Sequence, residues 1–297
     1  MRRHVLLAGL CTVDVVQRVT ELPAPGEKVQ SLSVDVAAGG PATNAAVTVA
    51  ALNRAAARSA SVEGGGVGAE AGRARLVTIL GAHPLADLAR ADLTACGVDL
   101  VDAAPSFVDP PALSAVAVRD RDGERTVISR NAAHSPDFPG TPWETDDVRT
   151  VLVDGHHPRL ALGTARWART QGIPVVLDAG SWKPVLDELL PLVDIAACSA
   201  QFPVPPLELL ARGVSTVITT AGPEPVRWRT AFAEGEVAVP VVNARDTLGA
   251  GDVWHGALAY GAGRFDLPEL IRYANEVAAM RVRHAGPRAW VGKVGVR

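Results

Sequence analysis

The amino-acid sequence predicts an α/β fold in which helices cover both faces of a mostly parallel sheet and a small antiparallel β lid projects from it. From residue 150 onward, short apolar segments alternate with helical segments, as in consecutive βαβ units. Earlier, residues 28–36 alternate polar and apolar side chains, and an Asp122-Gly123 turn joins two β-prone segments, which indicates antiparallel pairing. With 297 residues and 48% hydrophobic side chains, the chain can bury a large core.

Each expected element rests on its own pattern. Short apolar runs predict buried parallel strands at 5–10, 76–80, 150–153, 174–178, 195–198 and 216–219. Helical spacing predicts helices at 44–57, 85–95 and 159–170 and over most of 253–283, with a loop at 58–74. The lid is expected from segments at about 28–38 and 112–130, and the whole chain, 1–297, is expected to form a single domain.

Bulk properties exclude several classes of protein. A net charge of −3 and a pI near 6.2 predict no general attraction to nucleic acid or to anionic membranes. The sequence contains no run of the roughly 20 apolar residues that a membrane span needs. The cysteines Cys11, Cys96 and Cys198 are odd in number and share no metal-binding spacing, so we expect reduced core thiols and a cytoplasmic protein.

The segment Asp246-Thr247-Leu248-Gly249-Ala250-Gly251-Asp252 is the strongest candidate for chemistry. Glycines allow a sharp turn and close approach of a ligand, and the helix-like run behind them offers unpaired N–H groups to an anion. A carboxylate beside an anion site is unfavourable for binding alone. Asp252 is therefore interpreted as a base that removes a proton from a hydroxyl attacking a phosphoryl group. A Gly-rich turn with Asp252 as a helix N-cap is the plainer alternative.

A second candidate site is the segment Gly39-Gly40-Pro41-Ala42-Thr43-Asn44. Adjacent glycines let the backbone approach a polyol, and an asparagine offers both a donor and an acceptor to paired hydroxyls. Asp14 follows the first expected strand, and ligands of open α/β sheets bind at the carboxyl ends of strands. These residues are therefore expected to bind a hydroxyl-bearing ligand, the alternative being a turn with Asn44 as a helix cap.

The two segments resemble the signatures of the PfkB, or ribokinase-like, carbohydrate kinase family, with ketohexokinase-like members as the suggested branch, and the resemblance extends over most of the chain. It implies a ribokinase-like three-layer α/β/α fold. It further implies a set of site residues: Asp252 as catalytic base, the N–H groups of Gly249, Ala250 and Gly251 as anion hole, Asp14, Gly39, Gly40, Asn44 and Asp154 for the sugar, and Thr220, Gly222 and Asn275 for the nucleotide.

The resemblance also implies cofactors, and the sequence departs from the family's pattern at one point that concerns them. ATP, Mg²⁺ and a monovalent cation, K⁺, near Asp246 are implied. The family's N-x-x-E segment is replaced here by Cys198-Ser199-Ala200-Gln201-Phe202, which puts the handling of Mg²⁺ in question. Asp178 and Lys183 could reach phosphate, but the sequence favours a surface position for both.

The predicted function is an ATP-dependent sugar kinase that transfers the γ-phosphoryl group to a hydroxyl of a monosaccharide or sugar acid. The lid is expected to close over the sugar and to form a homodimer interface. Two alternatives remain open at this stage: a nucleoside kinase of the same fold, adenosine-kinase-like, and a sugar-binding relative that has lost catalysis.

Overall fold

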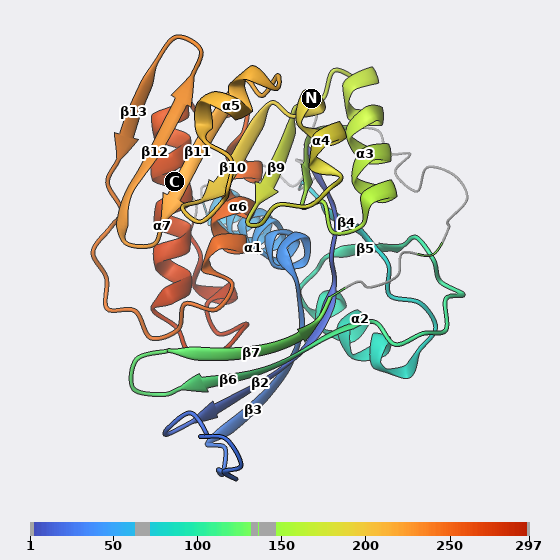
Figure 1. Cartoon of the computed structure of the whole chain (residues 1–297), viewed down its shortest axis with the longest axis vertical. Coiled ribbons are helices and arrows are strands. Elements are labelled where there is room, and N and C mark those ends of the chain that lie inside the picture. The colour runs from blue at the N-terminus through green and yellow to red at the C-terminus, as the bar shows by residue number, and fades with distance from the viewer. Residues whose placement is uncertain (1–2, 63–71, 132–135, 137–146, 296–297) are drawn as a thin grey trace.

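The computed structural model describes residues 3–62, 72–131, 136 and 147–295. Its large sheet is built from β1 (His4–Ala8), β4 (Ala74–Thr78), β5 (Asp99–Asp102), β8 (Val148–Val153), β9 (Val175–Ala179), β10 (Ile195–Ser199), β11 (Thr216–Ala221), β12 (Glu224–Thr230) and β13 (Glu234–Val237). The strand order is β13-β12-β11-β10-β9-β8-β1-β4-β5 (Figure 1). Strands β11 to β5 pair in parallel, and β12 and β13 add an antiparallel edge.

Helices cover both faces of this sheet, which gives the predicted three layers. One face is covered by α1 (Pro41–Val62), α2 (Pro84–Ala95), α6 (Ala250–Gly261) and α7 (Leu267–Val282), and the other by α3 (Pro158–Thr170), α4 (Leu186–Leu189) and α5 (Pro206–Ala211) (Figure 1). Because successive side chains of a strand point to opposite faces, Leu7 packs in the first core and Leu6 in the second. Both are fully buried, as expected for a sheet covered on both sides.

A second, four-stranded sheet projects from one end of the molecule (Figure 1). It contains β2 (Thr12–Val19), β3 (Ser33–Gly39), β6 (Ala112–Arg119) and β7 (Arg125–Arg130), in the order β3-β2-β6-β7. The β3–β2 and β6–β7 pairs are antiparallel, and β2 joins β6 in parallel. The predicted fold class, a large mostly parallel sheet with a smaller antiparallel sheet, is confirmed by this arrangement.

Some element boundaries differ from the sequence prediction. The strand expected at 28–36 is β3, which begins at Ser33 because its register is set by pairing with β2, whose Arg18 lies opposite Ser33. Strand β2 itself was not predicted, because the polar residues Asp14 and Arg18 make it resemble a loop. Helix α1 begins at Pro41 and continues to Val62, so it takes in the first residues of the loop expected at 58–74, and residues 63–71 of that loop lie outside the described residues.

Two observed features bear on the predicted compartment. Cys11, Cys96 and Cys198 are buried free thiols, as expected. Among the described helices, none combines the length and the apolar character that crossing a membrane requires. The cytoplasmic location stays a prediction.

Candidate active site

The turn that leads into α6 is shaped by its own sequence. Asp246 Oδ1 accepts a hydrogen bond from the Leu248 N–H at 3.0 Å, and Gly249 adopts a left-handed conformation with φ of 70°. A side chain is strained at such a φ, so glycine suits this position. Helix α6 starts at the next residue, Ala250, and Asp252 lies in its first turn. The turn therefore presents a helix N-terminus and a carboxylate together.

The Asp252 carboxylate is held by a residue from the other predicted segment. Asn44 Nδ2 donates a hydrogen bond to Asp252 Oδ2 at 2.9 Å, although 208 positions separate the two residues. Burial and the nearby Asp178 charge together raise the pKa of Asp252 to about 6, although the Asn44 hydrogen bond and His255 act in the opposite direction. A carboxylate with this pKa is ionised at neutral pH and is a stronger base than an exposed aspartate, as general base catalysis requires.

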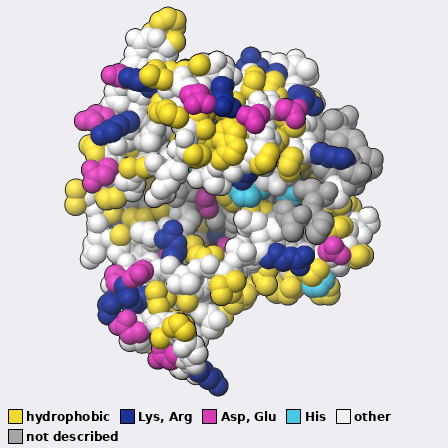
Figure 2. All heavy atoms as spheres, viewed as in Figure 1, with side chains coloured by type: hydrophobic (Ala, Val, Ile, Leu, Met, Phe, Trp, Pro, Cys, Tyr) yellow, Lys and Arg dark blue, Asp and Glu magenta, His cyan; other side chains and the backbone are white. Residues whose placement is uncertain are grey.

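A cavity of about 140 Å³ lies between the small sheet and the N-terminal ends of α1 and α6. Figure 2 shows the surface hollowed between the projecting sheet and the rest of the molecule. Five of the predicted site residues line it: Asp14, Gly40, Asn44, Gly249 and Asp252. The remaining lining residues are mainly apolar and come from the small sheet and from the chain around α6 and α7: Val16, Ala37, Ala38, Ser114, Val116, Val127, Leu248, Val253, Arg281, Pro287 and Trp290.

Asp14 lies at the base of the small sheet, facing this cavity. Thr12 Oγ1 donates a hydrogen bond to Asp14 Oδ1 at 2.5 Å. Burial raises the pKa of Asp14, while hydrogen bonds from Thr12 and Ser114 lower it. A Cβ atom on Gly39 would lie 1.9 Å from Asp14 Oδ2, so Gly39 leaves the space that the carboxylate fills. Gly39 thus shapes the site without being one of the cavity-lining residues.

Asp154, predicted to bind the sugar, is placed differently. It is 1% exposed, and its carboxylate accepts hydrogen bonds from the backbone N–H groups of Leu10 (2.9 Å), Ala42 (3.2 Å) and His156 (3.0 Å). Burial acts against ionisation of Asp154, but its contacts with His156 and these N–H donors hold its pKa below the ordinary value. Asp154 therefore fastens the chain between β1 and β2 to the start of α1, instead of facing the cavity.

A cluster that the sequence did not indicate orients Asn44. The Arg288 guanidinium, in the loop after α7, contacts both carboxylate oxygens of Asp92, with the shortest distance 2.7 Å. It also lies 3.4 Å from Asn44 Oδ1 and donates to the Ala38 carbonyl. Because Arg288 occupies the amide oxygen of Asn44, the amide nitrogen faces Asp252. No local motif marks Arg288, which lies 196 positions from Asp92.

The surface position predicted for Asp178 is wrong, because this residue is buried. It is 5% exposed at the carboxyl end of β9, and its Oδ2 lies 2.9 Å from Nδ1 of the buried His255 in α6. Burial lowers the pKa of His255, whereas the nearby Asp178 and Asp252 carboxylates raise it. The net effect is a pKa above the ordinary histidine value. His255 and Asp178 thus form a buried contact beside Asp252. Lys183 donates to Ser181 and stays near the surface.

The three residues predicted to bind the nucleotide, Thr220, Gly222 and Asn275, differ in their exposure to solvent. Thr220 is the residue before the last of β11, and its hydroxyl lies 3.4 Å from the Cys198 carbonyl. Gly222 lies in the exposed turn into β12 with φ of 61°. Asn275 is 2% exposed in α7. Its side chain accepts from Trp254 Nε1 at 2.8 Å and donates to the Ala238 carbonyl at 3.1 Å. The Asn275 amide is thus engaged inside the protein.

The surroundings of Asp246 do not fit the predicted monovalent cation. Asp246 is 1% exposed, and both of its carboxylate oxygens are occupied. Oδ1 accepts from the Leu248 N–H and lies 3.4 Å from Arg281, while Oδ2 accepts from the Gly286 N–H at 2.9 Å and from Arg18 at 3.1 Å. Alkali cations are held by several oxygen atoms that replace their water. Here guanidinium and N–H donors already use these oxygens.

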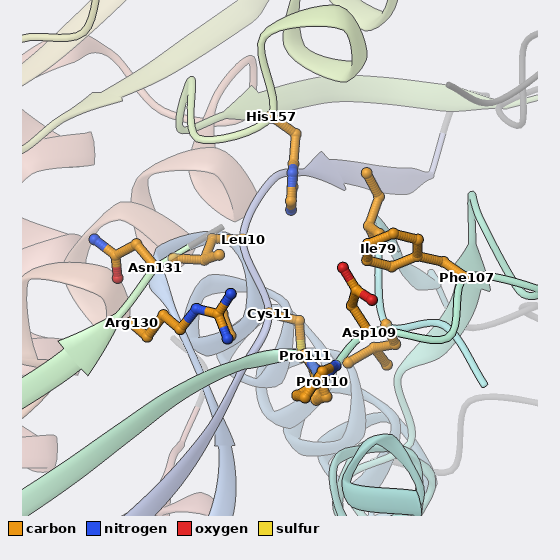
Figure 3. Close-up of a pocket in the computed structure, with 12 residues that line it drawn as sticks. Leu10, Cys11, Ile79, Phe107, Asp109, Pro110, Pro111, Arg130, Asn131 and His157 are labelled. Carbon is orange, nitrogen blue, oxygen red and sulfur yellow. The ribbon is translucent and has the colours of Figure 1, made fainter. Parts of the chain in front are cut away.

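A smaller hollow of about 30 Å³ lies beside the main cavity, at the root of the small sheet. Figure 3 shows Arg130 and Asn131 on one side of it, Asp109 and Phe107 on the other, and His157 facing it from the loop between β8 and α3. Burial lowers the pKa of His157 to about 4, so its imidazole is neutral at neutral pH. This hollow adds polar and apolar groups next to the cavity that contains Asp14.

Comparison with known proteins gives the same fold and the same family signature. A family model described as pfkB family carbohydrate kinase matches residues 207–291, which include the turn into α6. A candidate ribokinase from Agrobacterium tumefaciens is 27% identical, with a TM-score of 0.81 over 98% of this chain and 94% of that one. Ribokinase from Arabidopsis thaliana, solved with ribose and ATP, is 19% identical, with a TM-score of 0.71 over 96% of this chain and 94% of that one.

A third similar structure is a nucleoside kinase. The nucleoside kinase from Burkholderia thailandensis, solved with inosine, is 18% identical, with a TM-score of 0.69 over 97% of this chain and 94% of that one. The resemblance to PfkB carbohydrate kinases that the motifs indicated is confirmed, and the fold is ribokinase-like. These matches support a kinase.

Proposed function

We propose that this chain is an ATP-dependent sugar kinase that transfers the γ-phosphoryl group to a hydroxyl of a neutral monosaccharide. The observation that carries the proposal is the meeting of Asp14 and Asp252 in one cavity, with the Asp252 carboxylate at the N-terminus of α6. Asp14 offers acceptors to the hydroxyls of a sugar. Asp252 is positioned to take a proton from one of them as it attacks phosphorus.

The first turn of α6 supports the phosphoryl group in this proposal. Backbone N–H groups at a helix start have no partner within the helix and favour negative charge. The Ala250 N–H donates to the Thr247 carbonyl at 3.2 Å, so Gly251, which is exposed, is the better donor of the two. Gly249 gives the turn its shape. Donors fixed in this way stabilise charge that develops during phosphoryl transfer, which depends mostly on positioning and electrostatics.

Ribokinase-like kinases use ATP, typically with Mg²⁺. Mg²⁺ keeps several waters and binds through one or two carboxylates together with the phosphates. Asp178, a buried carboxylate near Asp252 at the carboxyl end of β9, would contribute one ligand through Oδ1, because its Oδ2 lies 2.9 Å from Nδ1 of His255. The bound ion would neutralise phosphate charge. Thr220 and Gly222, at the end of β11, are proposed to contact the nucleotide, and Asn275 to support the adjoining loop through Ala238.

The charges around the cavity favour a neutral acceptor over a sugar acid or a sugar phosphate. Among the described lining residues, Asp14 and Asp252 are acidic and Arg281 is basic. Arg281 is committed to Asp246 and to the His284 carbonyl. An anionic acceptor would therefore meet two carboxylates without a free cation to balance them.

A nucleoside remains the second candidate, because the cavity has an apolar wall. Val16 and Val116 of the small sheet, together with Trp290, are among the residues that line it. Apolar and aromatic side chains of this kind form platforms for bases. Catalytic loss, the third possibility considered from the sequence, is disfavoured by the raised pKa of Asp252, because simple sugar binding does not need a buried base.

A coupled assay of ADP formation over a panel of sugars, sugar acids, sugar phosphates and nucleosides tests the proposal. The expected result is turnover with a neutral sugar and none with its phosphorylated or acidic counterpart. Turnover only with nucleosides would support the second candidate. Saturable sugar binding without turnover of any acceptor would show that the chain binds sugar without catalysing transfer.

The small sheet is proposed to act as a lid and as a homodimer interface. Its outer face is apolar: Val36 of β3, Ala115 of β6 and Ile128 of β7 lie in one row across the sheet, and Val36 and Ile128 are 47% and 75% exposed. A second copy would remove these side chains from water. Sedimentation is expected to give a dimer that Ile128→Glu converts to a monomer; a monomeric parent chain would refute the interface.

A further inference from the structure

We infer that the Arg281 guanidinium, assisted by Arg18, stands at Asp246 in place of the monovalent cation that the family resemblance implies. The role of this ion pair in catalysis rests on the proposed kinase function. The test of the ion pair itself does not depend on that function. The basis of the inference is the set of contacts around one buried carboxylate, which come from three separate parts of the chain: the turn into α6, the end of α7 and the small sheet.

Arg281 occupies the oxygen atoms that a cation would need. It is 2% exposed in the last turn of α7, and its NH2 group lies 3.4 Å from Asp246 Oδ1. Its NH1 group donates to the His284 carbonyl at 2.8 Å and to the Asp246 carbonyl at 3.3 Å. One carboxylate and two carbonyls therefore surround a fixed positive charge. A carboxylate with two carbonyls is also the kind of oxygen set that binds an alkali cation.

Arg18 supplies a second positive charge from the small sheet. Its NH2 group donates to Asp246 Oδ2 at 3.1 Å, and its NH1 group lies 3.4 Å from Asp120. Because Oδ2 also accepts from the Gly286 N–H, both carboxylate oxygens are shared between an arginine and a backbone donor. Like charges repel at this distance, so a third cation would have to displace one of the arginines.

The ion pairs act on the catalytic turn through Asp246. The same carboxylate that binds the arginines accepts the Leu248 N–H, which sets the turn ahead of Gly249 and Asp252. A dissociable cation at this position would make the shape of the turn depend on ionic conditions. A covalently attached guanidinium makes it independent of them, and Arg281 is in this sense a positioning residue.

Thermal unfolding of the full chain tests the inference without any need for turnover. The melting temperature is measured at equal ionic strength in KCl, NaCl and tetramethylammonium chloride, whose cation is too large for the site. The parent chain is expected to give the same value in all three salts. A saturable rise that is specific to K⁺ would overturn the inference, whether or not the chain proves to be a kinase.

Variants that remove the arginine test the same inference. Arg281→Met removes the internal cation and keeps the length of the side chain. It is expected to lower the melting temperature in tetramethylammonium and to recover about 2–4 °C specifically in K⁺. Arg283→Met, an exposed arginine two residues further on, is the matched control and should do neither. An Arg281→Met protein that folds and shows no K⁺-specific recovery would also count against the inference.

Turnover provides a separate readout. If a sugar substrate is found, its turnover is expected to be equal in K⁺ and in tetramethylammonium for the parent chain. Activation that requires K⁺ would overturn the inference and leave the kinase function intact. Absence of turnover with every acceptor would refute the proposed function, and the unfolding data would still decide the identity of the cation.

Discussion

Replacing Asp252 by asparagine is expected to stabilise the fold, and the gain is expected to depend on pH. Burial and the Asp178 charge raise the pKa of Asp252 from 3.8 to about 6 in the folded state. The folded protein therefore holds this proton more tightly than the unfolded chain does. Stability is lost as the pH rises from the unfolded pKa to the folded pKa, and the loss is complete above about 6.

The size of the effect follows from the shift. A difference of about two pKa units, at about 1.36 kcal/mol per unit, sets an upper value near 3 kcal/mol. Asp252 keeps some contact with solvent, so about 1–2 kcal/mol is a more realistic figure after screening. An asparagine introduced at this position can still accept the hydrogen bond from Asn44 through its amide oxygen, so the substitution removes the charge and leaves the contact.

Urea unfolding of both proteins at about pH 4 and about pH 7 measures the effect. Asp252→Asn should be close to the parent chain at the lower pH and more stable at the higher one. Asp35→Asn, which removes an exposed carboxylate of β3, is the control and should change little. An Asp252→Asn protein that is no more stable than its parent at about pH 7 would refute the assignment of Asp252 as a buried base with a raised pKa.

Three further predictions concern the same site. The kcat/KM for the sugar should rise about tenfold per pH unit below the pKa of about 6 and level off above it, because ionised Asp252 is the base; a profile that is flat from about pH 4 to pH 7 would contradict this. Arg288→Leu should lower kcat/KM about tenfold or more, with partial rescue by Arg288→Lys, since a lysine cannot bridge Asp92 bidentately; unchanged kinetics would remove its positioning role. Gly40→Ala should destabilise the fold by at least about 1–3 kcal/mol, because φ is 94° and the new Cβ would lie 2.5 Å from the Leu10 carbonyl oxygen. Urea unfolding should show a smaller loss for Gly26→Ala, where φ is also positive but the Cβ meets nothing within 4 Å.

The sequence predicted the parts of the site that are encoded locally. Gly249 and Asp252 belong to one turn, and Gly40 and Asn44 to another, so their types and spacing could be interpreted without a structure. The meeting of the two turns in one site was implied by the family resemblance, because neither turn follows a parallel strand of the large sheet. Strands β1, β4, β8, β9, β10 and β11 of the large sheet were predictable because they are short apolar runs, whereas β5, β12 and β13 were not predicted.

The remaining parts depend on contacts between residues far apart in the chain. Arg18 lies 228 positions from Asp246, and Arg288 lies 244 positions from Asn44. An isolated arginine carries no local signal of its partner. The sequence misleads at Asp154, whose position after a strand fits a ligand contact. The lack of space between it and Gly9, together with three backbone N–H donors, makes it a structural group.

The central claim is that Asp252 activates an acceptor hydroxyl for attack on ATP. Its most direct test is the turnover of Asp252→Asn with the best neutral sugar at saturating ATP, after unfolding data have shown that the variant is folded. The account predicts that kcat falls by about 10²–10⁴ while sugar binding is retained. Turnover close to that of the parent chain would contradict it.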